Sequence, residues 1–229
     1  MVVKIKKLYF IFFIFFSYNS FASDKVKIIR DAEIELFLQK IIISITENLE
    51  KTTQKFYPRL ILNNEYNAFV TGSNKIYINT GLIKKASSIG EIQGVIAHEI
   101  GHLVLNHHST RTINKTQNST YSTIAAIAGI GLSMEGKLAS DTVVGLIVGS
   151  QDLATKSYLQ FTRIQEQQAD KFALDVMYKS KIPLNGLEHL LSRLSEEELL
   201  SQSMRTNFYR SHPFSKLRLR QLKEYVNLT

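Results

Sequence analysis

The 229-residue sequence contains no cysteine, so the chain can form no disulfide bond. A metal ion would have to be held by His, Asp or Glu side chains alone. The sequence also lacks a Gly-rich phosphate loop and any run of Lys or Arg that could follow a nucleic-acid backbone. These absences exclude a disulfide scaffold and predict no nucleic-acid partner. Imidazoles and carboxylates remain as the groups that could carry chemistry.

No apolar run is long enough to span a bilayer comfortably. A shorter apolar run lies near the N-terminus. Three lysines precede the apolar stretch 8–16, and Ser20 and Ala22 are small residues at the usual cleavage positions. This pattern predicts a signal peptide over residues 1–22, cleaved after Ala22. The alternative is an uncleaved N-terminal anchor. Export without cysteine suits a bacterial periplasm, and no lipoprotein is expected because no cysteine follows the apolar run.

The remaining residues, 23–229, have the length of one domain with a proper core. They contain no internal repeat and no low-complexity linker. The formal net charge of +8 falls to +5 when Lys4, Lys6 and Lys7 are removed with the leader. This mild excess could favour an anionic membrane surface. An ordinary solvated surface is the preferred interpretation.

The motif His98-Glu99-Ile100-Gly101-His102 lies inside an apolar run and predicts a buried helix. Ser88 and Glu91 form a capping box that predicts where this helix begins. Residues four apart share a helical face, so His98 and His102 can bind one Zn²⁺. Glu99 is placed to accept a proton from a water in the metal's open position. The alternative is a chance pattern, although burying these side chains without a metal would be costly.

A catalytic zinc needs a third protein ligand. His107 and His108 follow closely, but in a continuous helix His107 is about 180° from His98, so it should face away. The better candidate is Glu166 in the segment Glu166-Gln167-Gln168-Ala169-Asp170. Asp170 shares its face and would hydrogen-bond the outer nitrogen of a zinc-bound imidazole. On spacing alone, a solvated charged face paired with Arg163 and Lys171 is the favoured interpretation.

The chain resembles gluzincin zinc metallopeptidases of the HtpX, BepA and Oma type, which are related to the CaaX prenyl proteases. Four segments carry the resemblance in the family's order: Asn67-Ala68-Phe69 with Asn79-Thr80-Gly81-Leu82, His98 to His102, Glu166 to Asp170, and Ser211-His212-Pro213 followed by Arg218. The resemblance implies one zinc ion per chain, bound by His98, His102 and Glu166, with Glu99 as the catalytic base. The sequence ends soon after Arg218, so a short form without the helical-repeat extension of some relatives is expected.

The fold is predicted to be α+β and mainly helical, with a small, mostly antiparallel sheet beside the zinc helix. A helix is expected from an Asp31 cap to about Thr52. Three strands should cover 59–62, 67–70 and 75–79, the last two joined by a turn at 71–74. Later helices are expected from about Ser157 to Tyr178, from an Asn185 cap through Leu194, and after Arg218.

The segment Asn67-Ala68-Phe69 is predicted to bind substrate. Peptidases of this fold class bind an extended peptide as an extra strand on a sheet edge, through main-chain hydrogen bonds. The alternative is an ordinary buried hairpin with Phe69 in the core.

Two stretches rich in Ala, Gly and Ile, 124–132 and 143–148, lie on either side of charged residues. Each is too short for a membrane span, and the charges oppose one continuous span. We expect a helical hairpin packed in the domain. The alternatives for residues 121–150 are a lid over the cleft or a surface that contacts a membrane.

His212 and Arg218 are candidates for roles beside the metal. Arg218 could form a buried ion pair with an acid near the metal or stabilise the oxyanion. His212 could approach the zinc and occupy the water position in a latent state. The alternative for both is a helix-start packing motif, and His189 is expected to be structural rather than a ligand.

The sequence therefore predicts an exported, zinc-dependent metalloendopeptidase of the bacterial periplasm. Its polypeptide substrates, unfolded or misassembled envelope proteins, follow from the resemblance alone. Peripheral association with a membrane or an envelope complex is compatible with this prediction. One rival is a chaperone-like factor that holds clients on the sheet edge, with cleavage secondary; another is an inactive zinc-binding structural domain. The sequence does not set the oligomeric state.

Overall fold

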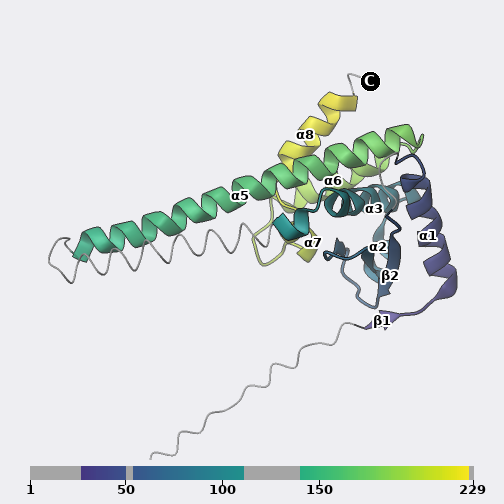
Figure 1. The fold of residues 1–229 in the computed structure, drawn as a ribbon, viewed down its shortest axis with the longest axis horizontal. Coiled ribbons are helices and arrows are strands. Elements are labelled where there is room, and N and C mark those ends of the chain that lie inside the picture. The colour runs from purple at the N-terminus through teal and green to yellow at the C-terminus, as the bar shows by residue number, and fades with distance from the viewer. Residues whose placement is uncertain (1–26, 50–53, 111–139, 227–229) are drawn as a thin grey trace, which may run out of the picture.

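The computed structural model describes residues 27–49, 54–110 and 140–226 (Figure 1). The leader predicted at 1–22 and the apolar stretch 124–132 lie outside these ranges. The elements follow in the order β1 (Ile28–Ile29), α1 (Ala32–Thr46), β2 (Tyr57–Ile61), β3 (Ala68–Val70), β4 (Lys75–Asn79), α2 (Thr80–Lys85), α3 (Ile89–Val104), α5 (Ser140–Lys179), α6 (Asn185–Glu197), α7 (Asn207–Ser211) and α8 (Ser215–Val226). The predicted α+β, mainly helical fold is confirmed.

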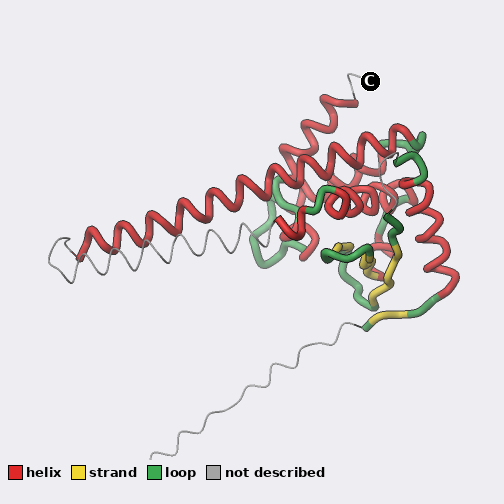
Figure 2. The backbone as a smooth tube through the Cα atoms, viewed as in Figure 1, coloured by secondary structure: helices red, strands yellow, loops and turns green. Residues whose placement is uncertain are grey.

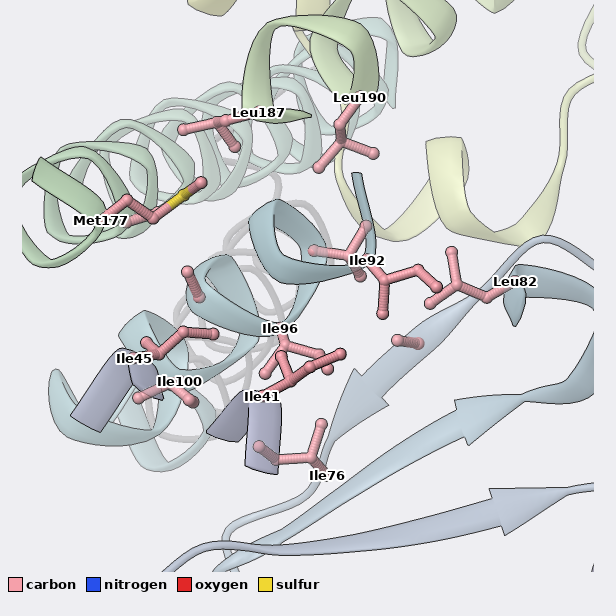
Figure 3. Packing of buried hydrophobic residues seen from close by; sticks show 14 of the residues in the cluster. Ile41, Ile45, Ile76, Leu82, Ile92, Ile96, Ile100, Met177, Leu187 and Leu190 are labelled. Carbon is pink, nitrogen blue, oxygen red and sulfur yellow. The ribbon is translucent and has the colours of Figure 1, made fainter. Parts of the chain in front are cut away.

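Helix α3 runs through the middle of the core. Every residue from Gly94 to His102 is buried, as expected for a helix that other elements cover on all sides. Helices α5 and α6 cover one side of α3 through Met177, Leu187 and Leu190, whereas α1 and the sheet cover the other (Figure 3). Burying a side chain such as those of Ile92, Ile96 and Ile100 contributes about 1.5–3 kcal/mol each. The motif is thus held inside the hydrophobic core.

The N-terminus of α3 is fixed as the capping pattern predicts. Ser88 is the N-cap, and its Oγ accepts a hydrogen bond from Glu91 N at 3.2 Å. The Glu91 carboxylate reaches Ser87 N at 2.7 Å rather than the cap residue itself. Its other oxygen accepts from Tyr66 Oη at 2.6 Å. Glu91 therefore ties the start of α3 to the chain just before β3.

The sheet has the order β1-β2-β4-β3. Its strands are the yellow segments of the tube in Figure 2. The pairs β1–β2 and β3–β4 are antiparallel and β2–β4 is parallel, so the sheet is mixed, with two of its three pairings antiparallel. Pro58 lies inside β2, which was predicted to start only at residue 59. It is accommodated because β1 pairs with Leu60 and Ile61 only, which leaves that side of Pro58 outside the ladder. Strand β3 is an edge of this sheet, beside α3.

Helices α3 and α6 approach closely at glycines. A Cβ atom on Gly186 would collide with the backbone of Gly90, and one on Gly94 would lie 3.0 Å from the backbone of Leu187. The absence of side chains at these positions lets α6 pack directly on the first turns of α3. Asn185, predicted as the cap of α6, is instead its first helical residue, and Leu184 is the N-cap without a side-chain bond.

Helix α5 is longer than the sequence suggested. It begins at Ser140 rather than near Ser157, so the apolar stretch 143–148 belongs to this helix. Its C-terminal part lies beside α3, while its N-terminal part extends beyond the other described elements (Figure 1). Helix α1 is shorter than predicted and ends at Thr46, although Asp31 is its N-cap as expected. Within the described ranges, no helix combines the length and apolar character that crossing a membrane requires.

Candidate metal centre

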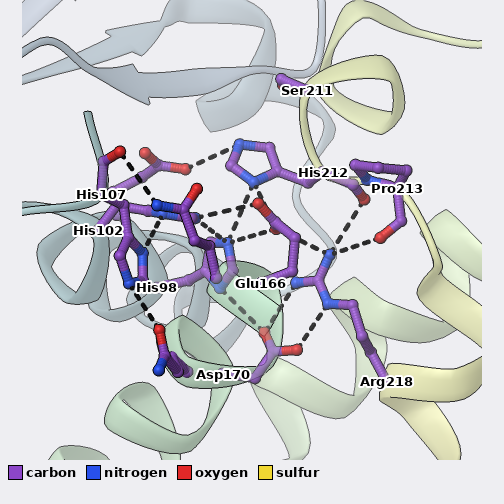
Figure 4. Close-up of polar contacts among 12 residues, drawn as sticks. His98, His102, His107, Glu166, Asp170, Ser211, His212, Pro213 and Arg218 are labelled. Atoms are coloured by element: carbon purple, nitrogen blue, oxygen red, sulfur yellow. Dashed lines mark hydrogen bonds and ion pairs between the residues drawn. The ribbon is translucent and has the colours of Figure 1, made fainter. Parts of the chain in front are cut away.

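His98 and His102 project from one face of α3, as their spacing predicts. Both rings are buried, and their Nε2 atoms lie 3.1 Å apart (Figure 4). The outer nitrogens face different partners. Nδ1 of His98 lies 2.9 Å from Asp170 Oδ1, and Nδ1 of His102 lies 2.9 Å from His107 Nδ1. The two Nε2 atoms are thereby directed toward a common point.

Helix α5 brings a fully buried carboxylate to that point. Glu166 Oε2 lies 3.3 Å from His98 Nε2, and Glu166 Oε1 lies 3.4 Å from His102 Nε2. Asp170, one turn later, contacts the outer side of the His98 ring. The structure therefore contradicts the interpretation of Glu166 and Asp170 as a solvated charged face and places both where the metal hypothesis puts them.

His212, which follows α7, joins the same cluster. Its Nδ1 lies 2.9 Å from Glu166 Oε2 and 3.1 Å from His98 Nε2, and its Nε2 lies 3.2 Å from Glu99 Oε1. One ligand atom each from His98, His102, Glu166 and His212 lies within 4.8 Å of the others. Four potential metal ligands thus converge on one small volume.

The dimensions of this cluster fit a metal ion. Tetrahedral bonds of about 2.0–2.1 Å to nitrogen and oxygen separate neighbouring ligand atoms by about 3.3 Å. The separations among His98 Nε2, His102 Nε2 and the Glu166 oxygens are 3.1, 3.3 and 3.4 Å. When both Nδ1 atoms carry protons for their outer partners, the two Nε2 lone pairs face each other. A cation between them relieves that repulsion, so the donor set suits a divalent metal.

Glu99 lies next to this cluster and is 1% exposed. Burial raises the pKa of Glu99, but the nearby His212, His102 and His98 rings outweigh that effect and lower it. The group is therefore a carboxylate near neutral pH. A buried carboxylate with an imidazole 3.2 Å away can accept and return a proton.

The charge states of the rings differ because their neighbours differ. Burial lowers the pKa of His102 to about 4, against the opposing effect of Glu166, so this ring is neutral as a metal ligand must be. Burial also lowers the pKa of His212, but the Glu166 and Glu99 carboxylates outweigh that effect and raise the pKa to about 9. A protonated His212 has no lone pair to offer a metal. That state would leave His98, His102 and Glu166 as the three candidate ligands, with His212 beside them.

Arg218 on α8 is fully buried behind the cluster. Its Nε and Nη2 donate to Asp170 at 2.6 and 2.8 Å, and Nη1 lies 3.1 Å from Glu166 Oε2. Burial raises the pKa of Asp170, but the Arg218 guanidinium outweighs it and lowers the value to about 2. Of the two predicted roles, the structure places Arg218 in a buried ion pair. Because Nη1 also donates to His212 O at 3.0 Å, Arg218 fixes the backbone that carries His212.

The prediction that His107 faces away is wrong. It assumed that the helix continues, but α3 ends at Val104 and Asn106 adopts a positive φ of 55°. This turn brings His107 back against His102, where it is 4% exposed. Its Nε2 lies 3.1 Å from Gln168 Oε1 on α5. The signal that could have revealed this contact is Asn106, since Asn tolerates the left-handed conformation that ends a helix.

The predicted substrate segment forms the edge strand β3 and the residue before it. Ala68 is buried, whereas Phe69 lies outside the core and stacks on Tyr77 with ring centroids 5.1 Å apart. The alternative with Phe69 in the core is therefore wrong. The side-chain Oδ1 of Asn67 is buried and has no hydrogen-bond partner among the described residues. His189, in contrast, is exposed on α6, away from the cluster.

Comparison with known proteins agrees with this geometry. The family model described as Peptidase family M48 matches residues 30–226. A beta-barrel assembly-enhancing protease of Escherichia coli is 21% identical over 201 residues, which are 87% of this chain and 40% of that protein. The metalloprotease YcaL of Escherichia coli is 22% identical over 190 residues, covering 82% of this chain and 68% of YcaL. Protease HtpX of Shewanella oneidensis is 32% identical over 145 residues, covering 55% of this chain and 49% of HtpX. The chain thus spans less than half the length of the first of these relatives.

Proposed function

The chain belongs to peptidase family M48, and from this membership we propose that it is a zinc-dependent metalloendopeptidase. The observation that carries the proposal is the convergence of His98, His102 and Glu166 at metal-ligand separations. Zinc suits two imidazoles and a carboxylate with a fourth position open. A bound zinc would act as a Lewis acid toward the scissile carbonyl and would make a water more acidic.

The chain's own residues supply the proton transfers and the alignment. Glu99 would take a proton from the attacking water and deliver it to the leaving amine. Asp170 fixes the orientation of the His98 ring from behind, and Arg218 in turn fixes Asp170. Burial of these groups excludes bulk water from the reacting centre.

Strand β3 is the proposed binding site for the substrate backbone. Because Asn79 N donates to Asn67 O at 3.1 Å, the antiparallel alternation directs the backbone groups of Ala68 and Val70 away from β4. A polypeptide in extended form could pair with them as a further strand, without regard to its sequence. This mode requires substrates that are unfolded, at least locally.

The proposed substrates are unfolded or misassembled proteins of a bacterial cell envelope. Support comes from two sources: the relative named beta-barrel assembly-enhancing protease, and the leader pattern over residues 1–22 that favours export to the periplasm. The rival chaperone-like function uses the same edge strand without cleavage. A Glu99→Gln variant separates the two, because it should keep client binding and lose hydrolysis.

His212 is proposed to hold the enzyme in a latent state. Its ring lies within 3.2 Å of Glu166, His98 and Glu99 and so fills the space that the substrate carbonyl and the attacking water would need. Activation then requires the segment around His212 to move away from the cluster.

The experiment that tests the proposed function is hydrolysis of casein by the purified chain. Cleavage that stops on addition of a chelator, returns with Zn²⁺ and is absent in Glu99→Gln supports it. Cleavage that persists in the chelator or in Glu99→Gln would refute it.

A further inference from the structure

The His98 and His102 rings of α3 differ in the partners of their outer nitrogens, the Nδ1 atoms. The outer nitrogen of His98 faces the Asp170 carboxylate, which is a strong acceptor. Among the residues that the structure describes, no carboxylate lies against the outer nitrogen of His102; its neighbour at 2.9 Å is the Nδ1 atom of His107. Two ring nitrogens at this distance form a hydrogen bond only if one carries a proton and the other does not.

The contact with Gln168 indicates which of the two Nδ1 atoms, that of His102 or that of His107, carries the proton. Its Oε1 lies 3.1 Å from His107 Nε2, and an amide oxygen can only accept, so His107 is protonated at Nε2. A neutral His107 then has a lone pair at Nδ1 and accepts from His102 Nδ1. This arrangement leaves the lone pair of His102 on Nε2, the atom that lies 3.4 Å from Glu166 Oε1.

The position of His107 is fixed by α5 and by Thr110. Gln165 Nε2 donates to His107 O at 3.2 Å, and Thr110 Oγ1 donates to the same oxygen at 3.1 Å. The segment that supplies Glu166 therefore also holds the ring and the backbone of His107. Four residues within six positions of α5 serve the cluster, either directly or through a neighbour: Gln165, Glu166, Gln168 and Asp170.

We propose that His107 is a positioning residue for the metal centre. The hydrogen bonds from Gln168 through His107 to His102 fix the tautomer and the orientation of the His102 ring. The inference rests on the proposed metal site and adds a residue outside its ligand set. Hydrogen-bond partners of metal-bound histidines raise ligand basicity, and their loss typically lowers metal affinity about 10–100-fold.

The test measures the affinity of the full chain for Zn²⁺ by competition with a chromophoric chelator. His107→Leu removes the acceptor, and we expect it to weaken zinc binding about 10–100-fold. His107→Asn should retain most of the affinity, because its amide oxygen can occupy the place of Nδ1. Gln168→Leu should weaken binding less than His107→Leu does, because it removes only the outer bond. His189→Leu and Gln167→Leu are matched controls in α6 and α5 and should leave the affinity unchanged.

A nitrogen-15 spectrum of the zinc-loaded chain supplies a readout that packing alone would not change. The His102 Nδ1–H signal should be protected from exchange in the unsubstituted chain and in His107→Asn, and should lose that protection in His107→Leu. Equal zinc affinity in His107→Leu and the unsubstituted chain would overturn the inference while leaving the proposed function intact. An equal loss in His107→Asn and His107→Leu would also overturn it. A chain that binds no zinc would overturn both.

Discussion

Asp170 Oδ1 lies 2.9 Å from His98 Nδ1, on the side of the ring opposite to Glu166. The same carboxylate accepts two hydrogen bonds from Arg218. Arg218 on α8 thus acts on the His98 ring on α3 through Asp170 on α5. The contact explains how the Arg218 segment, remote in sequence, can be coupled to the metal centre.

Replacing Arg218 with Met should destabilise the fold. The change leaves the Asp170 and Glu166 carboxylates buried without their cation, and breaking a buried pair from one side costs about 3–5 kcal/mol. The free energy of unfolding, measured in urea, should fall by that amount. Arg220→Met, which removes an arginine whose side chain is 70% exposed, should change the free energy little. Equal effects of the two substitutions would contradict the structure around Arg218.

The Asp170 pair should also make stability depend on acid pH. The pKa of Asp170 is about 2 in the folded chain and 3.8 ordinarily, so the unfolded chain binds the proton first as pH falls. The stabilisation is present above about pH 4 and is lost between about pH 4 and pH 2. The stability difference between the unsubstituted chain and Asp170→Asn should therefore shrink over that window. A difference that stays constant with pH would show that the carboxylate charge contributes nothing.

His212→Ala should raise basal casein cleavage if His212 holds the enzyme latent. The substitution removes the ring that lies 2.9 Å from Glu166 and 3.2 Å from Glu99 and opens the space between them. Initial rates with equal zinc loading provide the measurement, with His189→Ala as the control at an exposed position. Unchanged or lower cleavage in His212→Ala would count against the latent state.

Gly186→Ala should push α6 away from α3. The added methyl group meets the backbone of Gly90, which cannot move aside as a side chain could. Overpacking of this kind typically costs about 1–3 kcal/mol, visible as a lower midpoint in urea. Gly90→Ala is the matched control, because its Cβ would meet only ordinary contacts at 3.6 Å and beyond. A tolerated Gly186→Ala would mean that the helices are less closely packed than described.

The sequence predicts those parts of the site that depend on local spacing. His98 and His102 share a face because four residues make about one helical turn, and the same holds for Glu166 and Asp170. Strand β4 was predicted with its observed bounds because alternating residues end at clear turn chemistry. The same turn, at residues 71–74, also predicts the edge strand β3 on its other side.

The remaining features depend on contacts between distant segments or on backbone turns. His107 was misplaced because a single positive-φ residue, Asn106, ends the helix that spacing alone would continue. The two-residue strand β1 is too short to leave a periodic signal, and the parallel pairing of β2 with β4 involves no local pattern. The three-part chain of Arg218, Asp170 and His98 joins three helices, so no sequence window contains it.

The most direct test of the central claim is metal analysis of the purified chain by mass spectrometry, before and after dialysis against a chelator, beside a Glu166→Gln variant. The account predicts about one zinc per unsubstituted chain, removed together with casein cleavage and restored with it, and much weaker zinc retention in Glu166→Gln because a ligand oxygen is lost. Zinc retained equally by Glu166→Gln, or no zinc in the unsubstituted chain, would contradict it.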